Sequence, residues 1–297
     1  MEKKRWIIGG IVLLSFFMVG SFDGAGAQEK IVVGSKGFTE QSILGNIVSL
    51  LMEANGFKVD RKIGLGGTVI CHEAIVRGDI NVYIEYTGTG LMAILKKPME
   101  KDPDEAYKIV KKEYEEKFKV QWLKPWGFNN TYVIAIRKAD SERLKIKKIS
   151  DLKAHAKDLV LGGTIEFIAR PDGIAGLNKH YDLKFKDQKG MDFGLVYKAI
   201  GEKQVDVVSA TATDGRIQAF DLVVLEDDMR FFPPYYAAPV VRMDLLGKAP
   251  QVADILNKLA GKIGDVAMAT MNYSVDGRKM DAEVVAKEYL KNNGFIK

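Results

Sequence analysis

Charged, hydroxyl and aromatic side chains gather at turns that follow short apolar runs. The turn at residues 34–39 reads GSKGFT, and residues 83–90 read YIEYTGTG. A turn from a strand into a helix offers an anion backbone N–H groups and the helix dipole, and Lys36 adds a point charge. Tyr86 is poorly placed for a simple core residue, so we expect it to face a ligand, with a buried tyrosine as the alternative.

A further candidate is Arg170, which stands before the Pro-Asp-Gly sequence of residues 171–173. An arginine can clamp a carboxylate with two parallel hydrogen bonds. A salt bridge on the protein surface is the alternative role. Together with Lys36, this residue favours a ligand that has an anionic end.

Other chemistries lack their motifs. The single cysteine, Cys71, cannot form an intramolecular disulfide, and the three histidines are widely scattered, so we expect no metal site. The turn GLGGT at 64–68 fits neither nucleotide-binding fingerprint, and we expect no cofactor. No Gly-x-Ser-x-Gly elbow occurs, and Glu40 and Glu85 fit capping or lobe contacts better than an acid pair. We therefore expect no catalytic residues and no enzyme, with a secreted hydrolase as a remote alternative.

The composition is that of an ordinary globular protein. Of 297 residues, 47% are hydrophobic and 28% charged, and the formal net charge is +5. Basic runs such as residues 145–148 lack interleaved aromatic residues, so we expect no nucleic-acid partner.

The amino terminus has the pattern of an export signal. A short basic start precedes the apolar run 7–20, and Ala-Gly-Ala at 25–27 fits signal-peptidase cleavage. We expect residues 1–27 to be a signal peptide that leaves a periplasmic protein, with an uncleaved anchor as the alternative.

The remaining sequence alternates between strand and helix patterns, which predicts an α/β fold with two lobes. Aromatic, proline-containing segments at 122–130 and 231–236 interrupt the alternation and suggest crossings between the lobes. We predict one discontinuous lobe from residues 28–129 plus 236–297 and a second lobe from residues 130–235. Such a pair places a ligand cleft between the lobes, at the carboxyl ends of strands, and predicts hinge closure.

We predict the following strands and helices from periodicity and turn residues. The strands are at 30–34, 57–63, 80–85, 132–137, 159–162, 205–209 and 237–242. The helices start at 39 and cover 68–77, 89–95, 104–118, 171–180 and 193–201, with three more between 243 and 290.

Six motifs carry a resemblance to a known family. In order they are GSKGFTEQSILG (34–45), GLGGT (64–68), EYTGTGL (85–91), FNNTY (128–132), RPDG (170–173) and TDGRI (213–217). In this order they resemble the osmoprotectant-binding proteins, the extracytoplasmic receptors of ABC importers for glycine betaine, choline and carnitine. The resemblance covers essentially all of the chain after the signal peptide.

That resemblance implies a two-lobed periplasmic-binding-protein fold, similar to type II, in which a tyrosine cage holds a quaternary ammonium ligand. Trimethylammonium has no N–H donor, so aromatic faces supply its attraction. By similarity, the cage consists of Tyr86, Tyr132 and Tyr235. The ligand carboxylate is bound by Lys36, Thr89 and Arg170, and Asn130 contributes its backbone carbonyl. The implied partners are a betaine-like zwitterion and the ABC permease, and we expect a monomer.

One cage position departs from the family pattern. Thr211 stands where relatives with a full cage carry a tyrosine, three residues before Asp214. Either a betaine is held less tightly, or Tyr236 or Phe167 completes the cage, or Thr211 contacts a different small zwitterion such as an amino acid or amine derivative.

Overall fold

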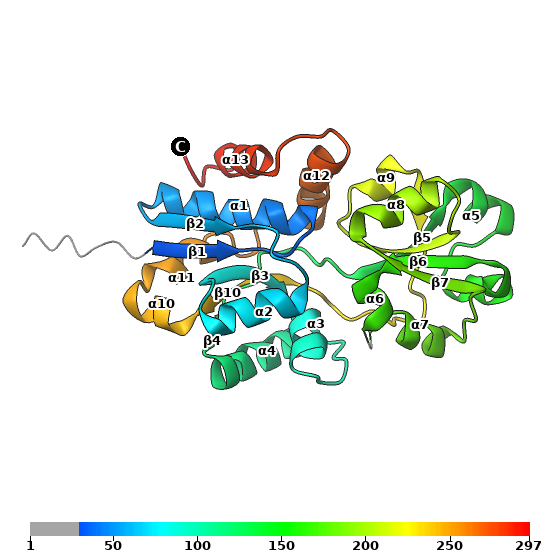
Figure 1. The fold of residues 1–297 in the computed structure, drawn as a ribbon, viewed down its shortest axis with the longest axis horizontal. Coiled ribbons are helices and arrows are strands. Elements are labelled where there is room, and N and C mark those ends of the chain that lie inside the picture. Colours follow the sequence, from blue (N-terminus) through cyan, green and yellow to red (C-terminus); the bar gives the residue numbers. More distant parts are fainter. Residues whose placement is uncertain (1–29, 171) are drawn as a thin grey trace, which may run out of the picture.

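Two lobes, each built on its own five-stranded sheet, make up the protein. The computed structural model describes residues 30–170 and 172–297. In Figure 1 the lobes lie side by side, and two extended segments connect them. The predicted two-lobed α/β fold is therefore confirmed. The predicted signal peptide, residues 1–27, lies outside the described residues.

The first sheet has the strand order β2-β1-β3-β10-β4. Its strands are β1 (Lys30–Gly34), β2 (Lys58–Lys62), β3 (Val82–Tyr86), β4 (Val120–Trp122) and β10 (Ala237–Arg242). The first three are parallel, whereas β10 runs antiparallel to β3 and β4. Every residue of β3 is buried, as expected for a central strand covered by helices on both faces. The carboxyl ends of β1 and β3 bring Lys36 and Tyr86 to the same edge of this sheet.

The second sheet has the order β7-β6-β8-β5-β9. Its strands are β5 (Tyr132–Arg137), β6 (Val160–Thr164), β7 (Asp187–Met191), β8 (Val207–Thr211) and β9 (Leu222–Val224). Strand β6 is parallel to β7 and β8, and β5 is antiparallel to β8 and β9. In the β5–β8 register Tyr132 lies directly opposite Thr211.

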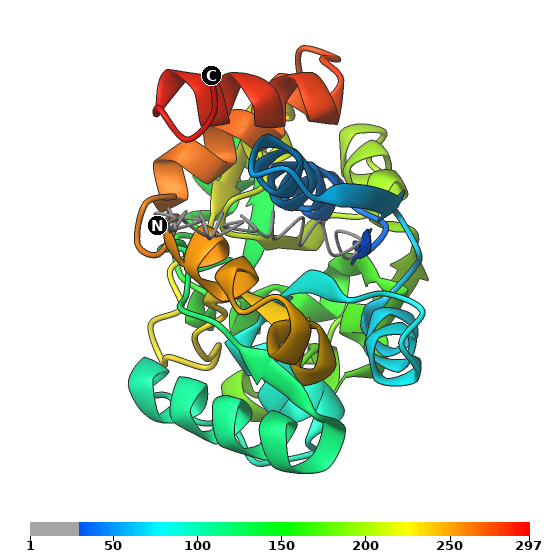
Figure 2. The same ribbon diagram turned by 90° about the vertical axis from the view of Figure 1, so that its left-hand side faces the viewer.

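Helices cover both sheets. Those of the first lobe are α1 (Thr39–Ala54), α2 (Thr68–Arg77), α3 (Thr87–Thr89), α4 (Pro103–Phe118), α10 (Met243–Lys248), α11 (Gln251–Asn257), α12 (Asp265–Asp276) and α13 (Ala282–Asn292). Those of the second lobe are α5 (Lys138–Leu144), α6 (Ile165–Ala169), α7 (Ile174–Tyr181), α8 (Phe193–Gly201) and α9 (Arg216–Ala219). Figures 1 and 2 show α1 and α13 on one side of the first sheet, and α2 and α4 on the other. No helix of residues 30–170 and 172–297 is both long and apolar enough to cross a bilayer.

The two crossings between the lobes are hydrogen-bonded to each other. The Asn130 N–H donates to the Tyr235 carbonyl over 3.1 Å, and the Tyr235 N–H donates to Asn129 Oδ1 over 2.7 Å. The first crossing includes Trp126, whose ring is fully buried in the core of the first lobe. The first crossing is therefore anchored in the first lobe, and the hydrogen-bonded pair forms the connection about which two-lobed folds of this kind rotate.

Several predicted helices needed correction. Four helices, not three, follow Arg242, because Pro250 separates α10 from α11. The helix predicted for 171–180 starts at Ile174 instead. Gly173 has a non-helical conformation there, and a Cβ on it would lie 1.8 Å from the Phe167 carbonyl oxygen. The helix predicted for 89–95 is α3 followed by a π-helical turn, Gly90–Ile94.

Candidate ligand-binding site

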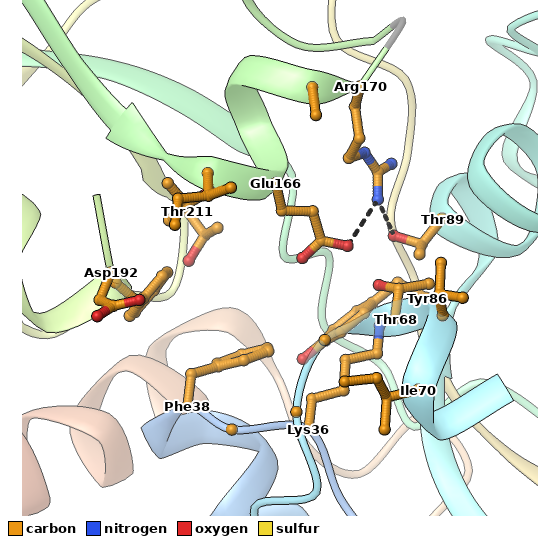
Figure 3. Close-up of a pocket in the computed structure, with 18 of the residues that line it drawn as sticks. Lys36, Phe38, Thr68, Ile70, Tyr86, Thr89, Glu166, Arg170, Asp192 and Thr211 are labelled. Atoms are coloured by element: carbon orange, nitrogen blue, oxygen red, sulfur yellow. Dashed lines mark hydrogen bonds and ion pairs between the residues drawn. The ribbon is translucent and has the colours of Figure 1, made fainter. Parts of the chain in front are cut away.

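A cavity of about 570 Å³ lies between the two lobes. Its walls come from the turns after β1 and β3, the start of α2, the two crossings, α6, and the ends of β7 and β8. Figure 3 shows Lys36, Phe38 and Tyr86 of the first lobe facing Glu166, Arg170 and Thr211 of the second. The cavity is thus a cleft at strand ends, in the position that the two-lobed fold predicts.

The structure brings all of the predicted site residues to this one cavity. The lining includes Lys36, Tyr86, Thr89, Asn130, Tyr132, Arg170, Thr211 and Tyr235. They come from segments spread over 200 positions of the sequence. Their roles toward a ligand stay predictions.

Three tyrosines present rings to the cavity. The Tyr132 and Tyr235 rings meet edge to face, with centroids 5.5 Å apart. Phe167 packs behind Tyr132 with centroids 5.0 Å apart and is itself fully buried. Tyr86 lies on the first lobe, where its ring centroid is 5.1 Å from Lys36 Nζ. Contacts with neighbouring side chains therefore hold all three rings in place.

Arg170 has one side engaged and one side facing the cavity. Its Nε and Nη2 pair with the Asp172 carboxylate, which also accepts a hydrogen bond from the Tyr235 hydroxyl. Its Nη1 lies 3.4 Å from Thr89 Oγ1 and 3.8 Å from Glu166 Oε1, as Figure 3 shows. Arg170 and Thr89, both assigned to the ligand carboxylate by similarity, thus lie together, and Nη1 is the Arg170 atom on the cavity side.

Lys36 is neutralised by a buried carboxylate. Its Nζ is 2.6 Å from Glu85 Oε1, and the two side chains are 4% and 0% exposed. The same carboxylate accepts hydrogen bonds from the Tyr86 N–H and the Tyr83 hydroxyl. The ammonium therefore reaches the cavity as half of an ion pair, with less net positive charge than the sequence suggests.

A second carboxylate, Glu40, lies behind the cavity wall, and its hydrogen-bond partners within residues 30–170 and 172–297 are all neutral. Its oxygens accept hydrogen bonds from the side chains of Tyr86, Asn130, Thr213 and Asn272, over 2.7, 2.7, 2.5 and 2.9 Å respectively. Burial raises the pKa of Glu40, and these hydrogen bonds oppose that rise. The side chain of Asn130 is therefore committed to Glu40, which leaves its backbone carbonyl as the group predicted to face the ligand.

Sequence reasoning missed part of the cavity wall. Phe38 and Phe193 contact each other across the lobes with ring centroids 5.3 Å apart, and Glu166 and Asp192 add carboxylates to the second-lobe wall. Phe38 stood inside a quoted motif and could have been selected as an aromatic residue at a helix start. The other three follow β6 and β7, and no motif marks them.

Thr211, at the cage position that departs from the family pattern, and the two residues considered as substitutes have distinct surroundings. Thr211 lines the cavity beside Tyr132. Phe167 lies behind Tyr132, and the Tyr236 N–H donates to Thr87 Oγ1 on the first lobe. Neither is among the residues that form the cavity wall in the described part of the chain. Phe38 and Phe193 are additional rings that the cavity offers.

The described residues offer neither a metal site nor a reactive thiol. No cluster of three or more histidine, cysteine, aspartate or glutamate side chains there could hold a metal ion. Cys71 is buried, and burial raises the pKa of its thiol to about 12. A thiol with that pKa is poorly nucleophilic at neutral pH.

Two lobes around a cleft of aromatic, hydroxyl and charged side chains define a solute-binding protein. Comparison with known proteins agrees with this class. Residues 29–292 match the family model described as the substrate binding domain of ABC-type glycine betaine transport systems. The chain belongs to this family. Its members are substrate-binding domains of transporters, so the prediction of a transport receptor and not an enzyme is confirmed.

Named relatives differ in ligand and in length. The chain is 36% identical over 300 residues to an ergothioneine transport permease/ergothioneine binding protein of Helicobacter pylori, covering 99% of this chain but 54% of that protein. It is 35% identical over 304 residues to a carnitine transport binding protein of Listeria monocytogenes, covering 100% of this chain and 99% of that protein.

A solved structure has a similar fold. It is described as a glycine betaine/carnitine/choline ABC transporter, with a TM-score of 0.75 and 35% identity, and the match covers 90% of this chain and 100% of that one.

Proposed function

We propose that this protein captures a small quaternary ammonium zwitterion such as glycine betaine outside the cytoplasm and delivers it to an ABC permease. The observation that carries the proposal is the cavity itself, where three tyrosine rings and the Nη1 side of Arg170 converge from both lobes. The named relatives for carnitine and the structural neighbour for glycine betaine, carnitine and choline support this ligand class.

The two ends of such a ligand need different partners. A trimethylammonium group gains roughly 0.5–2 kcal/mol from each aromatic face, which is the proposed role of Tyr86, Tyr132 and Tyr235. The carboxylate would receive hydrogen bonds from Arg170 Nη1 and Thr89 Oγ1, which already lie 3.4 Å apart. Lys36 would contribute a weaker attraction, because Glu85 neutralises it.

A longer betaine with a ring is a second candidate, and a specific observation favours it. The second-lobe wall carries Glu166 and Asp192, and the Phe38–Phe193 pair lies at the same cavity. Carboxylates accept hydrogen bonds from ring N–H groups, and aromatic side chains stack on planar rings. Ergothioneine, the ligand named for the Helicobacter pylori relative, is a betaine that carries such a ring. A different small zwitterion, such as an amino acid, is the remaining alternative.

The organisation of the transport unit forms part of the proposal. We assign a periplasmic, monomeric protein whose signal peptide ends at residue 27. Residues 28–129 plus 236–297 form one lobe, and residues 130–235 form the other. Closure about the paired crossings would bring Lys36, Tyr86 and Thr89 toward Tyr132 and Arg170, and the closed form would dock on the permease.

Isothermal titration calorimetry of the protein against glycine betaine, proline betaine, choline, carnitine, ergothioneine, amino acids and polyamines tests this function. A trimethylammonium compound should bind tightest. If amino acids or polyamines bind more tightly than every trimethylammonium compound, the proposed ligand class is wrong.

Tyr132 provides a matched pair of variants for the cage. In Tyr132→Phe the ring is kept, so affinity for the best trimethylammonium ligand should change little. In Tyr132→Leu the ring is lost, and affinity should fall by about 1–2 kcal/mol. Equal affinities for the two variants would contradict a cation–π role for this residue.

Thr211→Tyr tests the cage position at which relatives with a full cage carry a tyrosine. If glycine betaine is the ligand, the added ring should increase its affinity by up to roughly 30-fold. Loss of the best ligand would instead mean that Thr211 contacts a part of the ligand other than its methylammonium group.

A further inference from the structure

Glu40 connects the ligand cavity to both lobes through one buried carboxylate. It is the second residue of α1, and its side chain is buried behind the wall that Tyr86 and Asn130 form. Of its partners, Tyr86 and Asn272 belong to the first lobe, Asn130 to the first crossing, and Thr213 to the second lobe. A carboxylate accepts about four hydrogen bonds, so its acceptor capacity is filled.

Three hydrogen bonds hold Thr213 in place. Its hydroxyl donates to Glu40 over 2.5 Å, its carbonyl accepts from Asn272 Nδ2 over 2.8 Å, and its N–H points to Asn130 Oδ1 over 3.4 Å. The loop that follows β8 of the second lobe is thus fixed to α1 and α12 of the first. Thr211, on the cavity wall, precedes this clamped residue by two positions.

The lobes also contact each other on the cavity side. The Phe38 and Phe193 rings meet across the cleft, and Arg170 Nη1 reaches Thr89 Oγ1. The described arrangement is therefore one in which a ligand can touch both lobes at once. Contacts that stabilise it raise affinity, because they reduce the cost of bringing the lobes together.

We propose that Glu40 is a positioning residue that latches the second lobe to the cage, coupling the orientation of Tyr86 and Asn130 to the placement of the Thr213 loop. This inference rests on the proposed function for its ligand, although the latch itself needs none. Thr213 and Asn272 are not among the described residues that line the cavity. The latch nevertheless gives both of them an effect on ligand affinity.

Two variants that leave Glu40 in place test the latch. Thr213→Val removes the hydroxyl donor with almost no change in shape, and Asn272→Ala removes the amide that bonds both Glu40 and the Thr213 carbonyl. Each should weaken binding of the best trimethylammonium ligand by about 3- to 30-fold, because a buried hydrogen bond of the Glu40 network is lost. Ser141→Ala is the matched control. It removes a buried hydroxyl whose 2.7 Å bond to the Ile146 carbonyl stays within the second lobe, so affinity should not change.

A distance measurement separates the latch from simple destabilisation and needs no ligand. Spin labels on Lys58→Cys and Lys184→Cys, both exposed, report the separation of the lobes. Cys71 is buried and should not compete for the label. In the absence of ligand, Thr213→Val should broaden and lengthen the distance distribution, whereas Ser141→Ala should leave it unchanged.

A double-mutant cycle between Thr213→Val and Tyr86→Phe measures the coupling directly. Their effects on affinity should be non-additive in the parent and additive when Glu40→Gln is also present. Additivity in the parent, or loss of thermal stability with unchanged affinity and lobe separation, would overturn the proposal. Absence of binding by every trimethylammonium compound would defeat the proposed function, while the distance measurement would still decide the latch.

Discussion

Two buried carboxylates lie beside the cavity, and different kinds of partner compensate their burial. Glu85 is paired with the Lys36 ammonium at 2.6 Å, and it also accepts hydrogen bonds from the Tyr83 hydroxyl and the Tyr86 N–H of its own strand. Glu40 is surrounded by neutral donors that come from several parts of the fold. The first arrangement is an ion pair within one lobe, and the second is a network that reaches the other lobe.

The difference shows how each carboxylate responds to loss of a partner. Removing one member of a buried ion pair leaves an uncompensated charge, which is strongly destabilising. Removing one neutral donor from Glu40 leaves three others and the favourable N-terminal end of α1. The Glu40 network can therefore loosen in steps, which suits a contact between parts that move relative to each other, whereas the Lys36–Glu85 pair suits a rigid wall.

The largest effect is expected from Glu85→Gln. The change leaves the Lys36 ammonium buried and unpaired, and the free energy of unfolding should fall by about 3–5 kcal/mol in urea denaturation. The double variant Lys36→Met with Glu85→Gln should recover most of that loss. If a ligand carboxylate meets Lys36 as proposed, saturating glycine betaine should also stabilise Glu85→Gln more than it stabilises the parent. A single variant as stable as the parent would contradict the ion-pair account.

A smaller loss is expected from Glu40→Gln. The glutamine amide nitrogen must face two of the groups that donate hydrogen bonds to the carboxylate. Those hydrogen bonds are lost, but no buried charge is left unpaired. The free energy of unfolding at pH 7 should fall by about 1–3 kcal/mol, less than for Glu85→Gln. Urea denaturation of the two variants under the same conditions measures the ranking, and the reverse order would refute the comparison.

A matched pair of tyrosines sharpens the contrast further. The Tyr86 hydroxyl donates to Glu40 over 2.7 Å, and the Tyr83 hydroxyl donates to Glu85 over 3.2 Å. Each Tyr→Phe change should cost about 1 kcal/mol of stability. Only Tyr86→Phe should also weaken ligand binding, by roughly threefold, because only that hydroxyl belongs to the latch. Calorimetry on both variants checks this, and equal affinities would remove the distinction between the two carboxylates.

The turns that build the first-lobe wall could be predicted because their pattern is local. An apolar run, a glycine turn and a helix start place Lys36 after β1 and Tyr86 after β3, and both were identified from the sequence. Arg170 was likewise identified from its place before the Pro-Asp-Gly sequence, and the family resemblance added Tyr132 and Tyr235. Each of these residues lines the cavity.

The rest depended on contacts between distant segments. Asp192 and Phe193 follow β7, an edge strand whose residues 187–190 are exposed, so no hydrophobic alternation marked it. The sequence favours a capping or lobe-contact role for Glu40, but it does not identify the partners Thr213 and Asn272, which lie 173 and 232 positions away. Only the packing of the lobes brings these groups together.

The smallest expected effect is a pH dependence of the Glu40 contribution. Burial raises the folded-state pKa of Glu40 above its ordinary value of 4.5, so above pH 4.5 the folded protein retains a proton that the unfolded chain has lost. Stability from this group is therefore fully present below pH 4.5 and declines as the pH rises through the folded-state pKa. Glutamine does not titrate, so the stability advantage of the parent over Glu40→Gln should be larger at pH 4.5 than at pH 8. Urea denaturation at a series of pH values measures this difference, with Ser141→Ala as a control whose deficit should not vary with pH. An advantage that grows with pH would mean that the hydrogen bonds from Thr213, Tyr86, Asn272 and Asn130 outweigh burial and hold the carboxylate ionised.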